Sequence, residues 1–157
     1  MPVQVRRATP DDAEAIADLA LQLVEQHVGY DPVRFSHIGN RAGMANYYGS
    51  RTTADGAVVL VVEEDATVVG FAYMEYEPVL YAELAVKVAW LHDIFIERPE
   101  RRSGAGHKLI EAAAMEAKSL GANKILLSVA AKNTNAQAFF EHEGFRTTMH
   151  EMMLTVE

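Results

Sequence analysis

The chain has 157 residues, half of them hydrophobic and 23% charged, a composition typical of one globular domain with a single core. It contains no cysteine, which excludes a disulfide scaffold, cysteine-ligated zinc and a cysteinyl intermediate. The formal net charge of -8 at pH 7 argues against a nucleic-acid partner and suits a cationic small substrate.

Targeting and metal signals are weak throughout. No apolar run approaches the roughly 18 residues of a membrane span, and the first residues lack the apolar stretch of a secretion signal. We therefore expect a cytoplasmic protein without a membrane partner. The six histidines show no metal-binding spacing, so no metal site is expected.

The N-terminal half predicts a strand, a helix and a β-hairpin. The strand covers Val3 to Arg7, and Thr9 is the expected N-cap of the helix, with Pro10 at the first helical position and Asp12 completing a capping-box-like pair. Apolar residues then recur at helical spacing and predict one buried face: Ile16, Leu19, Leu23 and Val24.

Residues 29–56 are rich in Gly, Asn and Tyr, and predict loop with one short helix around Ala42 to Tyr48. Two β-branched runs follow, Ala57 to Glu63 and Thr67 to Glu77. The turn at residues 64–66 makes them a hairpin, whose second arm is expected to end at Pro78.

The C-terminal half alternates strands and helices. The predicted elements are a strand at Val88–Ile96, a helix at Gly104–Leu120 capped by Gly121, a fully apolar strand at Ile125–Val129 buried on both faces, a helix at Thr134–Glu143 ended by Gly144, and a last strand at Thr147–Val156. This order predicts a parallel βαβ core joined to an antiparallel N-terminal half, a mixed α/β (α+β) sheet in a single domain over residues 1–157.

The connection at residues 94–107 is the most informative stretch. A strand leads through a basic turn directly into a helix, whose unpaired N–H groups and positive dipole end favour phosphate. Gly104 and Gly106 allow a close backbone approach, and three arginines add positive charge: Arg98, Arg101 and Arg102. A P-loop would need Gly-Lys-Ser/Thr, and a dinucleotide fingerprint would need glycine where Leu109 stands, so both alternatives fail. A charged turn that merely caps a helix remains an alternative.

The pattern Arg-x-x-Gly-x-Gly after a Pro-Glu turn resembles the pyrophosphate loop of the GNAT superfamily of acetyl-CoA-dependent N-acetyltransferases. A second segment, Asn133 to Phe145, is similar to that superfamily's Asn-x-x-Ala-x-x-Phe-Tyr-Glu-x-x-Gly-Phe. The two segments occur in the family's order with a strand between them. With the N-terminal helix and hairpin, the resemblance covers nearly the whole chain and is weakest from Gly29 to Gly56.

The resemblance implies that the fourth strand splays from the fifth and that the acyl-pantetheine of acetyl-CoA lies in the gap. Strand backbone groups would then bind the pantetheine, one N–H would polarise the thioester carbonyl, and loop amides from Arg102 to His107 would hold the pyrophosphate. Asn133 would contact the pantetheine arm. The cofactor-binding residues implied in this way are Ile94, Phe95, Ile96, Arg101, Arg102, Ser103, Gly104, Ala105, Gly106, His107, Asn133, Ala136 and Phe140.

The implied reaction transfers an acetyl group from acetyl-CoA to a primary amine of a small molecule or peptide. The amine must first lose a proton, which costs about 4.6 kcal/mol at pH 7 for an amine of pKa ~10.4. The family's acidic position in the fourth strand corresponds to His92, followed by Asp93, and these are the candidate bases. Because strand side chains alternate, we expect Asp93 to point to the face opposite His92 unless a bulge intervenes. His92 packed against a neighbour, without a catalytic role, is the alternative.

Phe140 departs from the family pattern. The family usually has a tyrosine there, which protonates the departing thiolate, and phenylalanine has no proton to give. This keeps open a second function, an acyl-CoA binding or sensing module without turnover. Polar residues that could line an acceptor pocket are Tyr30, Tyr47, Tyr48, Glu75 and Glu77. The oligomeric state stays open, a homodimer included.

Overall fold

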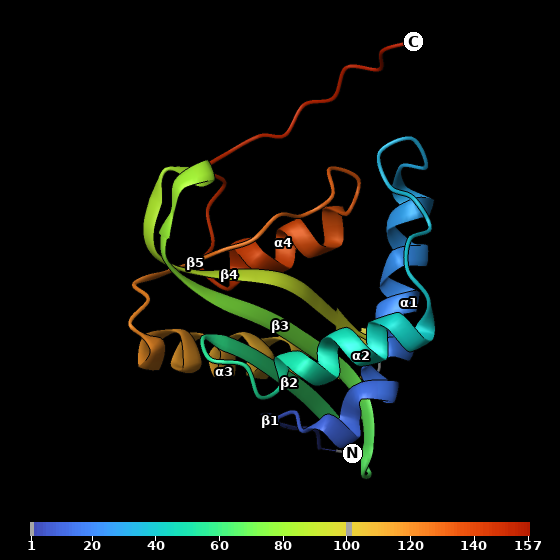
Figure 1. Cartoon of the computed structure of the whole chain (residues 1–157), viewed down its shortest axis with the longest axis vertical. Coiled ribbons are helices and arrows are strands. Elements are labelled where there is room, and N and C mark those ends of the chain that lie inside the picture. The colour runs from blue at the N-terminus through green and yellow to red at the C-terminus, as the bar shows by residue number, and fades with distance from the viewer. Residues whose placement is uncertain (1, 100–101) are drawn as a thin grey trace.

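The computed structural model describes residues 2–99 and 102–157, and it confirms the expected mixed α/β class (Figure 1). One sheet has the strand order β1-β2-β3-β4-β5, antiparallel from β1 to β4 and parallel between β4 and β5. The elements are β1 (Gln4–Arg7), a 3₁₀ turn (Pro10–Asp12), α1 (Ala13–Tyr30), α2 (Arg41–Arg51), β2 (Ala57–Glu64), β3 (Thr67–Leu80), a 3₁₀ turn (Tyr81–Glu83), β4 (Ala85–Ile96), α3 (Ala105–Leu120), β5 (Lys124–Leu126) and α4 (Thr134–His142).

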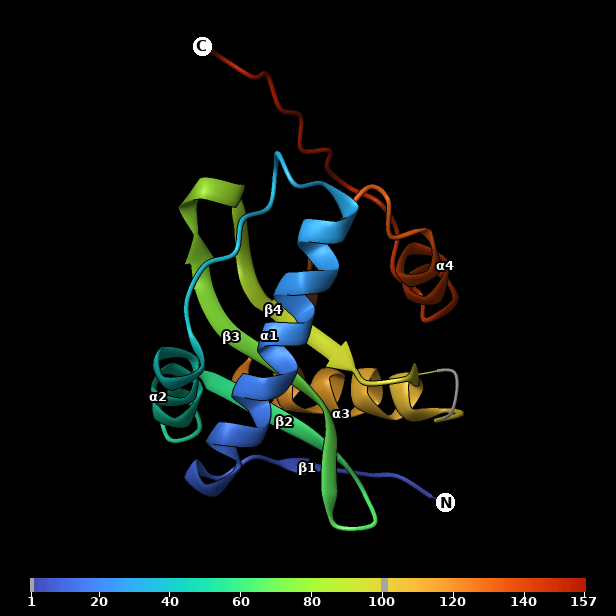
Figure 2. The same cartoon turned by 90° about the vertical axis from the view of Figure 1, so that its right-hand side faces the viewer.

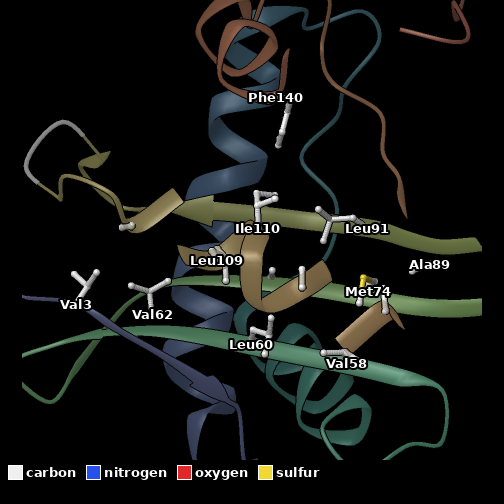
Figure 3. Close-up of a cluster of buried hydrophobic side chains, with 14 of the residues drawn as sticks. Val3, Val58, Leu60, Val62, Met74, Ala89, Leu91, Leu109, Ile110 and Phe140 are labelled. Atoms are coloured by element: carbon white, nitrogen blue, oxygen red, sulfur yellow. The ribbon is translucent and has the colours of Figure 1, made fainter. Parts of the chain in front are cut away.

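Helices cover both faces of the sheet, as Figure 2 shows with α1 in front of it and α3 behind. The sheet has a hydrophobic core on each face, one between the sheet and α3 and one between the sheet and α1. Alternating side chains of β2 enter these two cores, called here the α3-side core and the α1-side core. Val58, Leu60 and Val62 point toward α3 (Figure 3), whereas Val59 and Val61 pack with α1. This two-sided burial explains why β2 reads as an unbroken apolar run.

The predicted start of the first helix is confirmed at Thr9 to Asp12. The Thr9 N–H donates to the Asp12 carboxylate at 2.8 Å, and Arg6 donates to the same carboxylate at 2.8 and 2.9 Å. The Arg6 guanidinium holds the pKa of Asp12 below its usual value. These contacts tie β1 to the beginning of α1.

The hairpin is confirmed, but its second arm does not end at Pro78. The strand β3 continues to Leu80, because the register passes from Glu77 paired with Val88 to Val79 paired with Val86. Pro78 has no partner in the register of β3 and β4. Lys87, which lies opposite it, has a positive φ of 54°. Proline is tolerated here because the pairing of β2 with β3 covers positions only up to Glu75.

Two expectations for the C-terminal half are wrong. The fifth strand is only Lys124–Leu126, and it is half-buried rather than buried on both faces, since it is the last strand of the described sheet. Residues 147–156 form no strand within the described chain and run as an extended, exposed segment away from the body (Figures 1 and 2). No helix in residues 2–99 or 102–157 is long and apolar enough to cross a membrane.

Gly106 is required by helix packing. A Cβ built at Gly106 would lie 2.8 Å from Cζ of Phe139, closer than any ordinary contact. Residue 106 lies in the first turn of α3 and Phe139 in α4. The missing side chain therefore lets the two helices approach each other.

We predict that Gly106→Ala destabilises the fold by about 1–3 kcal/mol, because the Phe139 ring must move or strain, and this outweighs the gain of about 1 kcal/mol in helix propensity. Urea unfolding measures the change. Gly29→Ala in α1 is the matched control, since a Cβ there meets nothing within 4 Å, and it should be neutral or stabilising.

Phe139→Leu in the Gly106→Ala background should recover part of the loss, as expected for residues in direct contact. Equal stability of Gly106→Ala and the parent protein would show that the contact does not constrain residue 106.

Candidate active site

A β-bulge at His92 shapes the centre of the sheet. The register between β3 and β4 changes from Met74 paired with Leu91 to Tyr73 paired with Asp93, which leaves His92 as the extra residue. A bulge of this kind shifts the alternation of all later side chains by one position.

The bulge brings His92 and Asp93 to the same face of the sheet. The imidazole of His92 stacks on the ring of Tyr73, with 5.2 Å between centroids and 20° between planes. Asp93 is paired with Tyr73 in the register and receives a hydrogen bond from Tyr48 of α2, on the same side. The expectation that Asp93 points to the face opposite His92 is wrong, because the β-bulge interrupts the alternation of side chains between these two residues.

The strands β4 and β5 separate just beyond Trp90. Their parallel pairing covers only Val88 to Trp90 on β4 and Lys124 to Leu126 on β5. The strand β4 continues to Ile96, where its other edge still pairs with β3 through Ala72, Phe71 and Gly70. Residues 91–96 therefore present backbone groups toward a gap that no described strand fills, which is the expected splay.

A cavity of about 460 Å³ occupies this gap. Its walls come from α1, the loop at residues 34–38, β4, residues 127–129 and α4. Leu91 and Phe140 belong to the α3-side core, whereas His92 and Asp93 lie on the α1 side. The cavity therefore joins the two faces of the sheet through the opening between β4 and β5.

Asp93 is the half-buried carboxylate in the wall of this cavity. Burial raises its pKa, and three groups act in the opposite direction: the hydrogen bond from Tyr48 and the charges of His92 and His27. The Tyr48 hydroxyl donates to Asp93 Oδ2 at 2.8 Å. Asp93 thus takes up a proton more readily than an exposed aspartate, as a carboxylate poised for proton transfer does.

A tyrosine network supports the His92 side of the cavity. The hydroxyls of Tyr47 and Tyr73 lie 3.0 Å apart, Tyr73 donates to Glu75, and Arg51 pairs with the same carboxylate. Burial raises the pKa of both Tyr48 and Tyr73, so their hydroxyls remain protonated at neutral pH.

The structure separates the expected acceptor-pocket residues. Tyr47, Tyr48 and Glu75 belong to the network beside the cavity, whereas Tyr30 packs edge-on against His27. Glu77 lines a smaller pocket of about 120 Å³ whose wall includes His92. The other residues of that wall are Leu80, Ala82, Glu83 and Trp90.

The start of α3 lies outside the lining of this cavity and offers backbone donors for an anion. Gly104 is the N-cap of α3 with a φ of 79°, and it provides no side-chain cap for the helix end. Two loop amides have partners inside the loop, because Arg102 N–H donates to Pro99 at 3.0 Å and Ala105 N–H donates to Arg102 at 3.1 Å. Among the described residues, the amides of Gly106 and His107 have no hydrogen-bond partner and can donate to an anion.

The arginine side chains of the loop behave differently from one another. Arg102 turns inward, donates to the carbonyls of Glu97 and Arg98, and lies 3.6 Å from the Glu64 carboxylate. These contacts hold the loop in place and take the Arg102 side chain away from the anion site. Arg101 lies outside the described residues. His107 Nδ1 lies 2.8 Å from Glu143, which raises the pKa of His107 and links α3 to the end of α4.

The second motif lines the opposite wall. Asn133 is the N-cap of α4, and its Oδ1 accepts from the Ala136 N–H at 3.1 Å. Asn133, Ala136 and Phe140 all line the cavity. Ile94 lines it as well, whereas the side chains of Phe95 and Ile96 pack into the two cores, so these two residues can contribute backbone groups only.

Sequence reasoning missed His27 and the loop at residues 34–38, both of which line the cavity. His27 stands four residues after Leu23, on the buried stripe of α1. A polar residue on an apolar helical face is a signal that could have identified it. The loop carries no motif, and its place in the wall follows from tertiary packing alone.

The comparisons with known proteins agree with this geometry. The sequence profile of the acetyltransferase (GNAT) family matches residues 21–145. The chain is 26% identical over 143 residues to the uncharacterized N-acetyltransferase YhfO of Bacillus subtilis (strain 168), which covers 91% of this chain and 89% of that protein.

Two solved structures share the fold. A variant of the BH1408 protein from Bacillus halodurans has a TM-score of 0.82 at 22% identity, covering 98% of this chain and 99% of the other. The aminoglycoside N-acetyltransferase AAC(6')-Iy, solved with a bisubstrate analogue of CoA, has a TM-score of 0.78 at 18% identity, covering 100% and 99%. The chain belongs to the GNAT acetyltransferase family, whose acetyl donor is acetyl-CoA.

Proposed function

We propose that this protein transfers the acetyl group of acetyl-CoA to a primary amine of a small molecule or peptide by direct attack on the thioester. One observation carries the proposal: a cavity that passes between β4 and β5 has His92 and Asp93 in one wall and the second motif, Asn133 to Phe140, in another. A thioester in this gap would meet a base candidate and open backbone donors together.

The residues present fit the donor. The edge of β4 at Ile94 to Ile96 offers backbone groups for the amide-containing pantetheine arm. The amides at the start of α3 and the positive end of its dipole suit the pyrophosphate. Asn133 keeps its side-chain NH₂ for the arm, because its Oδ1 is engaged by Ala136.

The chemical step balances without a further reactant. The neutral amine nitrogen forms a bond to the acetyl carbon, the carbon–sulfur bond breaks, and its electron pair leaves on the sulfur. A backbone N–H on the β4 edge stabilises the negative charge that develops on the carbonyl oxygen. The proton released by the amine passes to His92 or Asp93, and the thiolate of coenzyme A is reprotonated from solvent.

His92 and Asp93 suit different parts of the proton transfer. His92 borders both the large cavity and the small pocket, so its imidazole can meet an acceptor that enters from outside. Asp93 is more buried, and its raised pKa makes it able to hold a proton near the reacting centre. We assign His92 as first proton acceptor, with Asp93 as its partner.

The small pocket favours a cationic acceptor. Glu77, Glu83 and Trp90 line it together with His92. Two carboxylates and an indole ring attract an ammonium group, and the net charge of -8 acts in the same direction. The aminoglycoside substrate class of AAC(6')-Iy, a multiply charged amine, is consistent with such a pocket.

Phe140 favours the rival function, an acyl-CoA binding or sensing module. It is 8% exposed and packs against Phe139 and Phe145, with centroids 5.4 and 5.5 Å away. It cannot protonate the thiolate, yet a thiol of pKa ~8.5 leaves without such help at a cost of about 3–5 kcal/mol in barrier. Slow but real turnover is therefore expected.

A thiol-release assay separates the two functions. We expect free coenzyme A to appear only when acetyl-CoA is supplied with an acceptor, and best with multiply charged primary amines from a panel that includes monoamines, polyamines, aminoglycosides and lysine peptides. Glu77→Gln should raise the KM for the preferred amine and leave the KM for acetyl-CoA unchanged. Tight binding of acetyl-CoA by calorimetry, with no release across the panel, would establish the binding module instead.

Asp93→Asn should separate catalysis from stability. Because the pKa of Asp93 is raised on folding, the folded state holds its proton more tightly, and the residue lowers the free energy of unfolding as pH rises from 3.8 through the raised pKa. Asparagine does not ionise, so it does not lower the free energy of unfolding in this way. Its side-chain oxygen can still accept the hydrogen bond from the Tyr48 hydroxyl. We expect Asp93→Asn to melt at a higher temperature at pH 7, to lose that advantage below pH 3.8, and to turn over about 100-fold more slowly.

Two further variants control for this result. His92→Ala should lower kcat at pH 7 with little change in the KM for acetyl-CoA, because the loss is confined to the transition state. Tyr48→Phe removes a hydrogen bond that lowers the pKa of Asp93, so the acid limb of the pH–rate profile should move to higher pH. Rates and profiles that survive all three changes would place deprotonation elsewhere.

A further inference from the structure

His27 places a second imidazole in the wall of the large cavity. It belongs to the last turn of α1, the helix that crosses in front of the sheet (Figure 2), and it lines the same cavity as His92 and Asp93. The negative end of the α1 dipole favours a positive charge at this place. The ring is half-buried, so water can reach part of it. His27 can therefore exchange protons both with the cavity and with solvent.

A hydrogen bond fixes which ring nitrogen of His27 exchanges the proton. Its Nδ1 lies 2.9 Å from the carbonyl oxygen of Leu23, one helical turn earlier. A carbonyl oxygen can only accept, so Nδ1 carries a hydrogen in both the neutral and the charged ring. In residues 2–99 and 102–157 no recorded hydrogen bond engages Nε2. Nε2 is therefore the atom that gains and loses a proton.

The loop after α1 holds this ring in place. Tyr30 and Phe35 pack edge-on against His27, with centroids 5.7 and 5.0 Å away. Asp31 sets the position of the loop, because its carbonyl accepts from the Phe35 N–H at 2.9 Å and its Oδ1 accepts from the Arg34 N–H at 3.1 Å. The loop thus has a definable use: it fixes the orientation of the imidazole in the cavity wall.

His27 and Asp93 sense each other's charge. The charge of His27 lowers the pKa of Asp93 and so acts against burial, which raises it. A proton that moves from the Asp93 carboxyl to Nε2 of His27 leaves a carboxylate and an imidazolium. These opposite charges stabilise each other across the cavity, so the transfer is favoured by the same interaction that couples the two groups.

The other groups around Asp93 are poor proton acceptors. Among the described residues, the titratable side chains in the cavity wall are His27, Arg34, His92 and Asp93. Arg34 stays protonated at any working pH. Tyr48 already donates to Asp93 at 2.8 Å, and its raised pKa keeps its hydroxyl protonated. His92 also lines the small pocket, so an acceptor bound there covers its outer side. His27 is the remaining exit.

We propose that His27 is a proton-relay residue, whose Nε2 takes from Asp93 the proton that the amine has lost and passes it to water. The O–H bond of the Asp93 carboxyl breaks and an N–H bond forms at Nε2. The imidazolium then releases that proton to water, so both residues return to their starting states. His27 acts through Asp93 and does not touch the acceptor. The relay rests on the acetyl transfer proposed above.

The variant His27→Asn tests the relay on the full chain. Its side-chain amide can donate the same bond to Leu23, but it cannot take up a proton. In a weak buffer at pH 7 we expect kcat with the preferred amine to fall about 10-fold and the KM for acetyl-CoA to stay unchanged. Free imidazole added to the buffer should restore most of the loss, because it can take the proton from Asp93.

The matched control is His142→Asn. It removes an imidazole that is 87% exposed and lies outside the lining of the cavity. It should keep the parent kcat in the same weak buffer and should not respond to added imidazole.

Nuclear magnetic resonance provides a readout that needs no turnover. In the parent protein the ¹⁵N shifts of neutral His27 should show a hydrogen on Nδ1 and none on Nε2. A carboxyl ¹³C titration should show a higher pKa for Asp93 in His27→Asn than in the parent, because the charge that lowers it is gone. Should the variant fail to fold, the tautomer in the parent decides.

Four results would overturn the relay in a parent protein that turns over. They are an unchanged kcat of His27→Asn in weak buffer; a loss that imidazole does not restore, which would leave His27 a structural role alone; a neutral His27 with its hydrogen on Nε2; and a pKa of Asp93 that does not move in the variant. A parent that releases no coenzyme A with any amine would instead refute the acetyl transfer, and the relay with it.

Discussion

The extra residue at His92 is the constraint on which the rest of the site depends. Without the bulge, β4 would alternate regularly, and Asp93 would point into the α3-side core, away from Tyr48. With it, His92 and Asp93 lie on one face, and pairing with β5 stops at Trp90. The inserted residue thus lies beside both features of the site: the two base candidates on one face, and the opening between β4 and β5.

The layers around this opening are built so that each wall comes from a different part of the chain. Helix α1 brings His27, α2 brings the Tyr48 hydroxyl, and α4 brings Asn133 and Phe140. Helix α4 is held against α3 because Gly106 leaves room for the ring of Phe139 and because His107 pairs with Glu143. The glycines of the loop therefore have two separate uses: Gly104 supplies the left-handed backbone at the helix start, and Gly106 supplies room for α4.

Much of this could be predicted from the sequence, because the signals are local. The cap at Thr9, the glycine at residue 121 and the β-branched hairpin depend on neighbouring residues, and each is confirmed. The errors concern non-local geometry. The bulge at His92 depends on how β4 meets β3, and the continuation of β3 past Pro78 depends on where β2 stops. The alternation in residues 147–156 predicts a strand, but this segment does not pair with the sheet. His27 was missed because its role appears only when α1 packs over β4.

A crystal structure with bound coenzyme A tests most directly the claim that the bulge and the splay form the donor site. The account predicts the pantetheine arm between residues 91–96 of β4 and residues 127–129, hydrogen-bonded to the backbone of Ile94 to Ile96. The pyrophosphate should lie at the start of α3, and His92 and Asp93 should both face the sulfur end. Coenzyme A bound outside the gap, or a β4 that pairs with β5 beyond Trp90 in the complex, would contradict it.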